Sequence, residues 1–145
     1  MSDITLILLA AGNSSRFGLP VKKQWLRINH TPLWHFVAEQ FEQTELFGNI
    51  IIVAHQEEVP FMKEFCDYTL VEGGETRQQS LKNALAKVTT PYVLVSDIAR
   101  ACVDEKLIRT LIAAKDSADV IVPTLAVTDT IVYDHTTIDR DMVKR

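Results

Sequence analysis

The chain has 145 residues, 47% of them hydrophobic, which is enough to bury one core of ordinary domain size. Its 15 basic and 19 acidic residues give a formal net charge of −4, which argues against a nucleic-acid-binding surface. Any phosphate site must therefore be built locally, from a few cations and backbone N–H groups.

The location suggested by the sequence is the cytoplasm. Cys66 and Cys102 have no metal-ligand spacing and form no disulfide framework, so we expect free thiols. No apolar run reaches the length of a membrane span. The run from Ile4 to Ala11 follows Asp3 instead of lysines, which favours a buried strand over a secretory signal.

Short apolar runs alternate with segments of helical period, a pattern typical of an α/β fold with a mostly parallel sheet covered by helices. Continuous apolar runs indicate strands buried on both faces. The predicted strands are Ile4–Leu9, Asn49–Ala54, Tyr68–Val71, Tyr92–Ser96 and Asp119–Val122.

Three helices are predicted between and after these strands. The first has Thr31 as its N-cap and Pro32 at its first position, the second spans about Thr76–Val88, and the third begins after Asp104. Pro60 makes Glu57–Phe65 a weaker candidate. The predicted inward residues are Leu33, Val37 and Phe41 in the first helix, Leu81, Ala84, Leu85 and Val88 in the second, and Leu107, Ile108, Leu111 and Ile112 in the third.

The pattern changes after Pro123. Residues Leu125–Asp134 alternate weakly and predict an extended arm, with the polar stretch Asp134–Thr137 as its turn. The sequence then reaches Arg145 without a closing strand or helix, so we expect the domain to continue beyond this residue.

The first candidate site is Leu9–Gly18, directly after the first strand. Small residues allow a ligand to approach the backbone closely, and successive N–H groups can bind an anion. The segment satisfies neither the dinucleotide fingerprint nor the P-loop pattern. Arg16 and Lys23 are cations suited to phosphoryl-group chemistry, although a solvated basic loop would also explain them.

The second and third candidates also follow predicted strands. In Glu72–Ser80, paired glycines permit a tight turn or close approach to a flat base, although an ordinary strand-to-helix turn explains them as well. In Val95–Ala101, Asp97 lies at a strand end where α/β sheets bind ligands, and it can hold Mg²⁺ beside a triphosphate or simply cap a helix. The histidines show no ligand spacing.

In this order the motifs resemble the 2-C-methyl-D-erythritol 4-phosphate cytidylyltransferase family. The resemblance rests on L-A-A-G-x-S-x-R-F followed by K-K-Q, then G-G-E-x-R-x-x-S, then S-D-x-A-R. It covers essentially all 145 residues, including T-P-L-W and the V-T-D-T segment Val127–Thr130. In some bacteria this domain is fused to 2-C-methyl-D-erythritol 2,4-cyclodiphosphate synthase, so the chain is also similar to the N-terminal part of such a bifunctional enzyme.

The resemblance implies a Rossmann-like three-layer nucleotidyltransferase fold, with one domain over residues 1–145 and a dimerisation arm at about 125–143. It also implies a role for individual residues. The catalytic cations would be Arg16 and Lys23, the Mg²⁺ ligand Asp97, the CTP-binding residues Ala10, Ala11, Gly12, Gly74, Glu75, Arg77, Ser80 and Arg100, and the residues for methylerythritol phosphate Thr130 and Arg140.

The implied reaction transfers CMP from CTP to 2-C-methyl-D-erythritol 4-phosphate and releases pyrophosphate, a step of non-mevalonate isoprenoid synthesis. The implied assembly is a homodimer that binds neither nucleic acid nor membrane. Two departures from the family pattern are present: Ser96-Asp-Ile-Ala-Arg-Ala101 replaces His-Asp-Ala-Ala-Arg-Pro, and the late T-P-Q, T-D-[DE] and lysine segments are absent.

Two alternatives stay open from the sequence. One is a nucleotidyltransferase of the same fold that acts on a sugar phosphate or a cofactor, although such relatives typically have L-A-G-G in the first loop. The other is a non-catalytic nucleotide-binding or dimerisation module.

Overall fold

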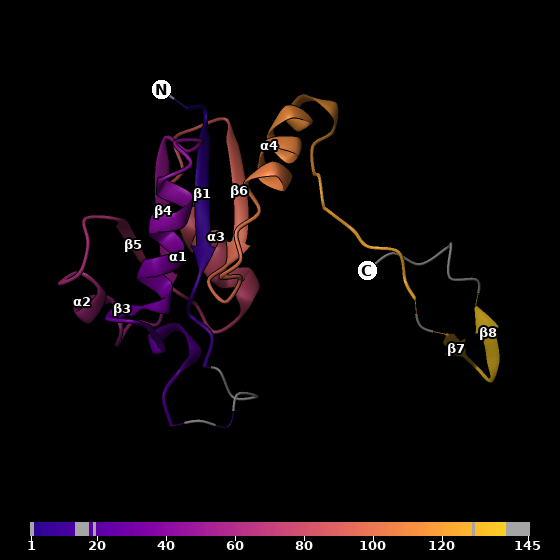
Figure 1. Ribbon diagram of the computed structural model, residues 1–145, viewed down its shortest axis with the longest axis horizontal. Helices are drawn as coiled ribbons and strands as arrows, with labels where there is room; N and C mark the ends of the chain where they lie inside the picture. The colour runs from indigo at the N-terminus through magenta and orange to yellow at the C-terminus, as the bar shows by residue number, and fades with distance from the viewer. Residues whose placement is uncertain (1, 14–17, 19, 129, 139–145) are drawn as a thin grey trace. The chain divides into compact units, whose positions relative to one another are not determined.

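The computed structural model describes residues 2–13, 18, 20–128 and 130–138 (Figure 1). The chain divides into two compact units, Met1–Asp104 and Glu105–Arg145. The prediction of one domain over 1–145 stays a prediction.

A four-stranded, all-parallel sheet forms the centre of the first unit, in the order β5-β4-β1-β6. Its strands are β1 (Ile4–Leu9), β4 (Asn49–Ala54), β5 (Thr69–Glu72) and β6 (Tyr92–Asp97). The sequence predicts the bounds of β1 and β4 correctly and those of β5 and β6 to within one residue. The α/β fold class is thereby confirmed.

Helices cover both faces of this sheet (Figure 1). They are α1 (Leu33–Glu42), α2 (Val59–Met62) and α3 (Arg77–Leu85). The chain moves outward from β1 to β4 to β5 and then returns across the sheet to β6. Because parallel crossovers are right-handed, this reversal places α1 and α2 on one face and α3 on the other.

The core lies in two layers on either side of the sheet. Ile7, Ile51, Val53 and Val71 pack with Ala84 of α3. Strand neighbours of opposite parity, Leu6, Leu8 and Ile52, are equally buried and point to the other face, as the two-residue period of a strand requires. Helix α1 contributes the fully buried side chains Trp34, Val37 and Ala38.

The predicted cap of the first helix is wrong. Helix α1 begins at Leu33 and Pro32 is its N-cap residue, because Thr31 pairs with Ile28 in a small hairpin, β2 (Arg27–Ile28) and β3 (Thr31–Pro32). The second predicted helix starts as expected: the Thr76 side chain accepts a hydrogen bond from Gln79 N at 3.0 Å. Its predicted inward residue Leu85 is 43% exposed.

The second unit contains α4 (Glu105–Ala113), the 3₁₀ turn η3 (Lys115–Ser117) and the strands β7 (Ile131–Tyr133) and β8 (Thr136–Ile138). Helix α4 begins after Asp104 as predicted, but of its residues only Ile108 is buried, and Leu107 is exposed. The predicted strand Asp119–Val122 is wrong, because among the residues that the structure describes this segment has no neighbouring strand to pair with its backbone.

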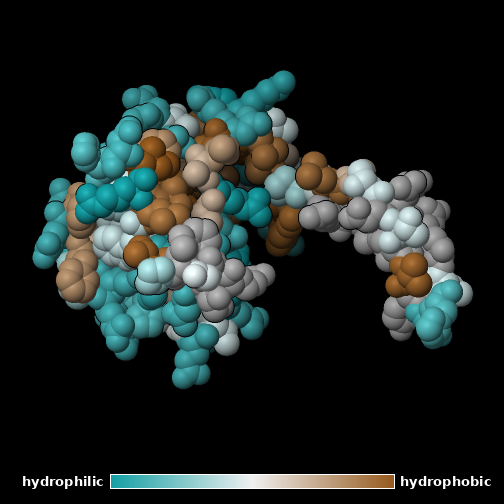
Figure 2. All heavy atoms as spheres, turned by 60° about the horizontal axis from the view of Figure 1, so that its bottom comes forward, coloured by the Kyte–Doolittle hydropathy of each residue, from teal (hydrophilic) through white to brown (hydrophobic). Residues whose placement is uncertain are grey.

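The predicted arm is a β-hairpin. Strands β7 and β8 are antiparallel, and Asp134 and His135 form a two-residue turn with φ values of 47° and 61°. Two positive φ angles are typical of the type I′ turn that suits tight hairpins. Apolar side chains stand at the surface of this unit (Figure 2), namely Val120, Val122, Leu125 and Val132. Over the described ranges of the chain, no helix is long and apolar enough to cross a membrane.

We predict that Ile51→Ala lowers the free energy of unfolding by about 3 kcal/mol, because it leaves a cavity between the sheet and α3. Urea denaturation followed by circular dichroism measures the change. Leu85→Ala on the exposed side of α3 is the control and should shift stability by less than about 0.5 kcal/mol. Equal effects of the two substitutions would contradict this assignment of the core.

Candidate nucleotide-binding site

The three candidate segments meet at the carboxyl edge of the sheet. Leu9 lies opposite Val53 on one side and Asp97 on the other, and Ala54 lies opposite Glu72. The order of strands reverses between β1 and β6, so Leu9 and Asp97 flank the topological switch point, where open α/β sheets bind ligands. All three segments therefore face one site.

The first loop is fixed by a buried glutamine. The Gln24 side-chain amide donates hydrogen bonds to the carbonyl oxygens of Ala10 at 3.1 Å and Gly12 at 3.3 Å. Ala10 N also donates to Val53 O at 2.7 Å. Ala11 is half-buried and Gly12 is exposed, so the loop presents backbone to solvent at the switch point.

The second loop approaches the first so closely that it requires glycine. A Cβ atom on Gly73 would lie 2.5 Å from Ala11 Cβ, and a Cβ on Gly74 would lie 2.2 Å from Gln79 Cγ. Gly74 N donates to Ser80 Oγ at 3.1 Å, so the buried Ser80 hydroxyl supports the loop backbone. The close approach that these glycines permit is to Ala11 and to Gln79, whereas the predicted approach to a flat base stays a prediction.

The third segment places a carboxylate among arginines. Arg77 donates a hydrogen bond to Asp97 Oδ1, and Arg100 Nε lies 4.0 Å from Oδ2. Asp97 is the last residue of β6, and both arginines are largely exposed. Glu75 is exposed on the neighbouring loop. The fold therefore brings Arg77, Asp97 and Arg100 together.

The donor set around Asp97 suits one kind of metal. In the described part of the chain, no group of three or more His, Cys, Asp or Glu side chains could hold an ion. Mg²⁺ usually keeps several waters and takes one or two carboxylates plus substrate phosphates. A single, half-buried carboxylate at the switch point fits an ion that arrives with a nucleotide, whereas it would not make a structural metal site.

Lys23 opens a short 3₁₀ turn, η2 (Lys23–Trp25), and is half-buried. The turn is linked to the first loop through Gln24. Of the other predicted site residues, Arg16 and Arg140 lie outside the described residues, and Thr130 is exposed in the second unit, just before β7.

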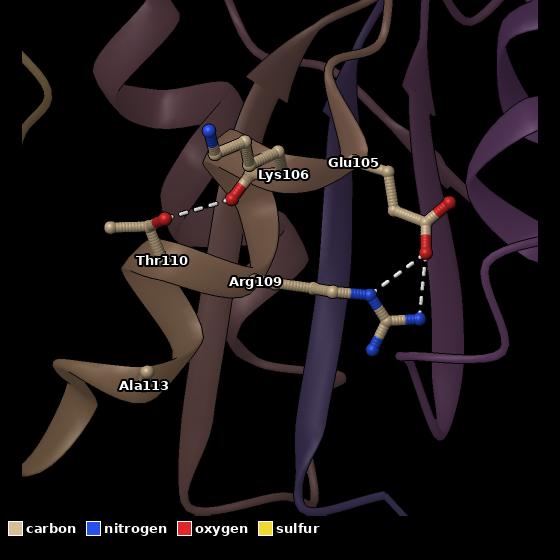
Figure 3. Close-up of a pocket in the computed structure, with 5 residues that line it drawn as sticks. All are labelled: Glu105, Lys106, Arg109, Thr110 and Ala113. Carbon is tan, nitrogen blue, oxygen red and sulfur yellow. Dashed lines mark hydrogen bonds and ion pairs between the residues drawn. The ribbon is translucent and has the colours of Figure 1, made fainter.

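A separate feature of the second unit is a shallow hollow on α4 (Figure 3). It is lined by one helix face, and its charged groups bond within that face: Arg109 Nη2 lies 2.6 Å from Glu105 Oε1, and the Thr110 hydroxyl donates to Lys106 O at 2.8 Å. Charges paired at i,i+4 on an exposed helix are ordinary surface structure.

Comparison with known proteins decides the family. The family model for 2-C-methyl-D-erythritol 4-phosphate cytidylyltransferase (IspD) matches residues 4–143. The chain belongs to the IspD family. This confirms the resemblance carried by the three motifs.

Relatives within the IspD family include two-function enzymes. The chain is 59% identical over 145 residues to the bifunctional enzyme IspD/IspF of Sulfurimonas denitrificans, covering 100% of this chain and 38% of that protein. The structure of the bifunctional IspDF from Campylobacter jejuni superimposes with a TM-score of 0.90 at 40% identity, over 99% of this chain and 39% of that one. The chain thus spans about two fifths of the length of these relatives.

A more distant structure supports the fold alone. The 2-C-methyl-D-erythritol 4-phosphate cytidylyltransferase from Thermus thermophilus aligns over 100% of this chain and 67% of its own, with a TM-score of 0.73 at 21% identity.

Sequence reasoning missed two residues of this candidate site. Gln24 belongs to the K-K-Q motif, but its contacts with the first loop arise from the fold. Glu58, which is 8% exposed, accepts hydrogen bonds from Gln24 and Trp25. Nothing in the local sequence distinguishes it from the exposed Glu57, because its burial depends on long-range packing.

We predict that Gly73→Ala lowers the free energy of unfolding by about 1–3 kcal/mol, because its methyl group would overlap Ala11 Cβ and push the two loops apart. The matched control is Gly12→Ala, since a Cβ at Gly12 meets nothing within 4 Å. Thermal unfolding of both variants is the measurement. A Gly73→Ala protein as stable as Gly12→Ala would show that the loops do not require this close approach.

Proposed function

We propose that the protein containing this chain transfers CMP from CTP to 2-C-methyl-D-erythritol 4-phosphate and releases pyrophosphate. The observation that carries the proposal is the meeting of the L-A-A-G loop, the G-G-E loop and Asp97 at the switch point of an IspD-family fold. Small residues form the two loops, and cations surround the carboxylate.

The proposed reaction is an in-line displacement at the α-phosphorus of CTP. A phosphate oxygen of methylerythritol phosphate forms a new P–O bond there, and the bond to the β-phosphate oxygen breaks, so pyrophosphate leaves. The nucleophile is already an anion, so little general-base catalysis is required and positioning and electrostatics supply most of the effect. Lys23, together with Arg16, would stabilise the negative charge that develops on the α-phosphate oxygens.

The backbone of Ala10, Ala11 and Gly12 would hold the triphosphate, and the Gly74–Ser80 segment would hold cytosine. Asp97 is the residue that would hold Mg²⁺, which when bound neutralises charge on the triphosphate. Arg77 and Arg100 would orient the Asp97 carboxylate through the contacts described above.

The homodimer is also a proposal, and the hairpin of the second unit supports it. An isolated two-stranded hairpin is marginally stable in water, and Leu125 and Val132 are exposed on this segment. A second subunit would cover such a hairpin, and would bring Thr130 and Arg140 to its neighbour's methylerythritol phosphate. A cytoplasmic location stays an expectation from the sequence.

We predict that the intact protein, with Mg²⁺, binds CTP at least about tenfold more tightly than UTP, ATP or GTP, a difference of about 1.4 kcal/mol. The physical reason is that polar groups in a base pocket are left unpaired by the wrong base. Isothermal calorimetry with the four nucleotides is the measurement. Preference for a different nucleotide would transfer the assignment to another nucleotidyltransferase activity.

We further predict that Lys23→Ala in the intact protein lowers kcat by at least about a hundredfold and changes the CTP dissociation constant much less. The lysine is expected to meet charge that is present mainly in the transition state. The control is Lys87→Ala, on an exposed residue after α3. Equal losses in turnover and affinity would refute this role for Lys23.

A further inference from the structure

Glu58 is a buried carboxylate with three donors from one short segment. Its Oε1 accepts from Trp25 Nε1 at 2.8 Å and lies 3.2 Å from Lys22 Nζ, and its Oε2 accepts from Gln24 Nε2 at 3.2 Å. Burying a carboxylate is costly unless it is paired and hydrogen-bonded, and these contacts meet that requirement. The three donors immediately flank or belong to the turn that carries Lys23.

The backbone of Glu58 is held by hydrogen bonds on both sides. Glu58 ends a turn that directly follows β4, and its backbone N donates to His55 O at 2.8 Å. Its carbonyl oxygen accepts from Met62 N at 3.0 Å, and Met62 is fully buried. The backbone of Glu58 is therefore anchored both to the turn after β4 and to helix α2.

The turn η2, in contrast, has little regular structure of its own. It is a three-residue 3₁₀ turn whose N-cap, Lys22, makes no side-chain capping bond. Such turns have poorer hydrogen-bond geometry than α-helices. Its orientation depends on tertiary contacts: the Trp25 ring packs edge-on against Trp34 and Phe65 at centroid distances of 6.1 and 6.3 Å, and Trp25 N–H bonds to Glu58.

Gln24 extends the same network to the first loop. Its side-chain nitrogen faces the Glu58 carboxylate and the carbonyl oxygens of Ala10 and Gly12, and all of these are acceptors. An amide nitrogen has two N–H groups, so one can serve the carboxylate and the other the loop. A single carboxylate thus connects the turn of Lys23 to the loop proposed to hold the triphosphate.

We propose that Glu58 is a positioning residue for cytidylyl transfer: its carboxylate fixes the Lys22–Trp25 segment and thereby aims Lys23 at the nucleotide held by the 10–12 loop. The inference rests on the proposed function and adds to it a residue that does not touch the substrate. A misplacement of a catalytic group by about 1 Å can cost about a hundredfold in rate, so a residue that only positions Lys23 can control turnover.

The test is a double-mutant cycle in the intact protein with Glu58→Gln and Lys23→Ala. The neutral amide keeps the size of the side chain, but its NH₂ group must face one of the donors that now surround the carboxylate. We expect kcat to fall at least about tenfold, with the CTP dissociation constant changed less than about threefold, because Ala10 keeps its bond to Val53 O. Glu57→Gln, on a neighbour whose side chain is 79% exposed, should leave both values unchanged.

The cycle separates positioning from general structural support. If Glu58 acts through Lys23, then Glu58→Gln should cause less than about a twofold further loss of kcat in the Lys23→Ala background. The same fold loss in both backgrounds would overturn the inference while leaving the proposed function intact. An unchanged rate for Lys23→Ala alone would refute the proposed role of Lys23, and this inference with it.

A second variant removes dependence on the folding of Glu58→Gln. Trp25→Phe keeps an aromatic ring against Trp34 and Phe65 but lacks the N–H that bonds to Glu58. In the same cycle with Lys23→Ala it should also lower kcat, and the two losses should again be non-additive. Full activity of a folded Trp25→Phe protein would overturn the proposed positioning role of Glu58.

Discussion

The parallel pairing of β1 on both of its edges is the constraint on which the rest of the site depends. With β4 on one side and β6 on the other, the end of β1 is held in register with Val53 and Asp97. The first loop must therefore leave the sheet beside Asp97, at the point where the order of strands reverses. The first loop and the Asp97 carboxylate lie side by side because the hydrogen bonds between β1 and β6 fix the positions of both.

Contacts between loops complete the arrangement. Gly73 allows the second loop to contact Ala11, and a methyl group at this position would overlap Ala11 Cβ. The Gln24 side chain donates hydrogen bonds to carbonyl oxygens of the first loop, and it also donates to the Glu58 carboxylate. The site is thus organised by buried side chains such as Gln24 and Glu58, whereas Gly12, Glu75, Arg77 and Arg100, which are proposed to meet the nucleotide, are exposed.

Much of this could be predicted from the sequence, since buried parallel strands are continuous apolar runs and the site motifs follow them directly. The strands β1 and β4 illustrate this, and so does the position of Asp97 at the end of β6. Features set by tertiary pairing could not be predicted. Thr31 belongs to a small hairpin instead of capping α1, and the apolar segment Asp119–Val122 is not a strand, since strand formation requires a neighbour that local sequence does not reveal. Glu58 has the same local character as Glu57, and packing alone distinguishes them.

The chain has two tryptophans: Trp25 belongs to the turn that carries Lys23, and the ring of Trp34 packs against it. The Trp25 indole N–H is bonded to a carboxylate, whereas Trp34 is fully buried and its N–H has no partner among the described residues. Indole emission depends on local polarity and on nearby charge, so the two rings occupy different optical environments 6.1 Å apart. The protein therefore carries an intrinsic fluorescent reporter of the environment of this turn, and it needs no added label.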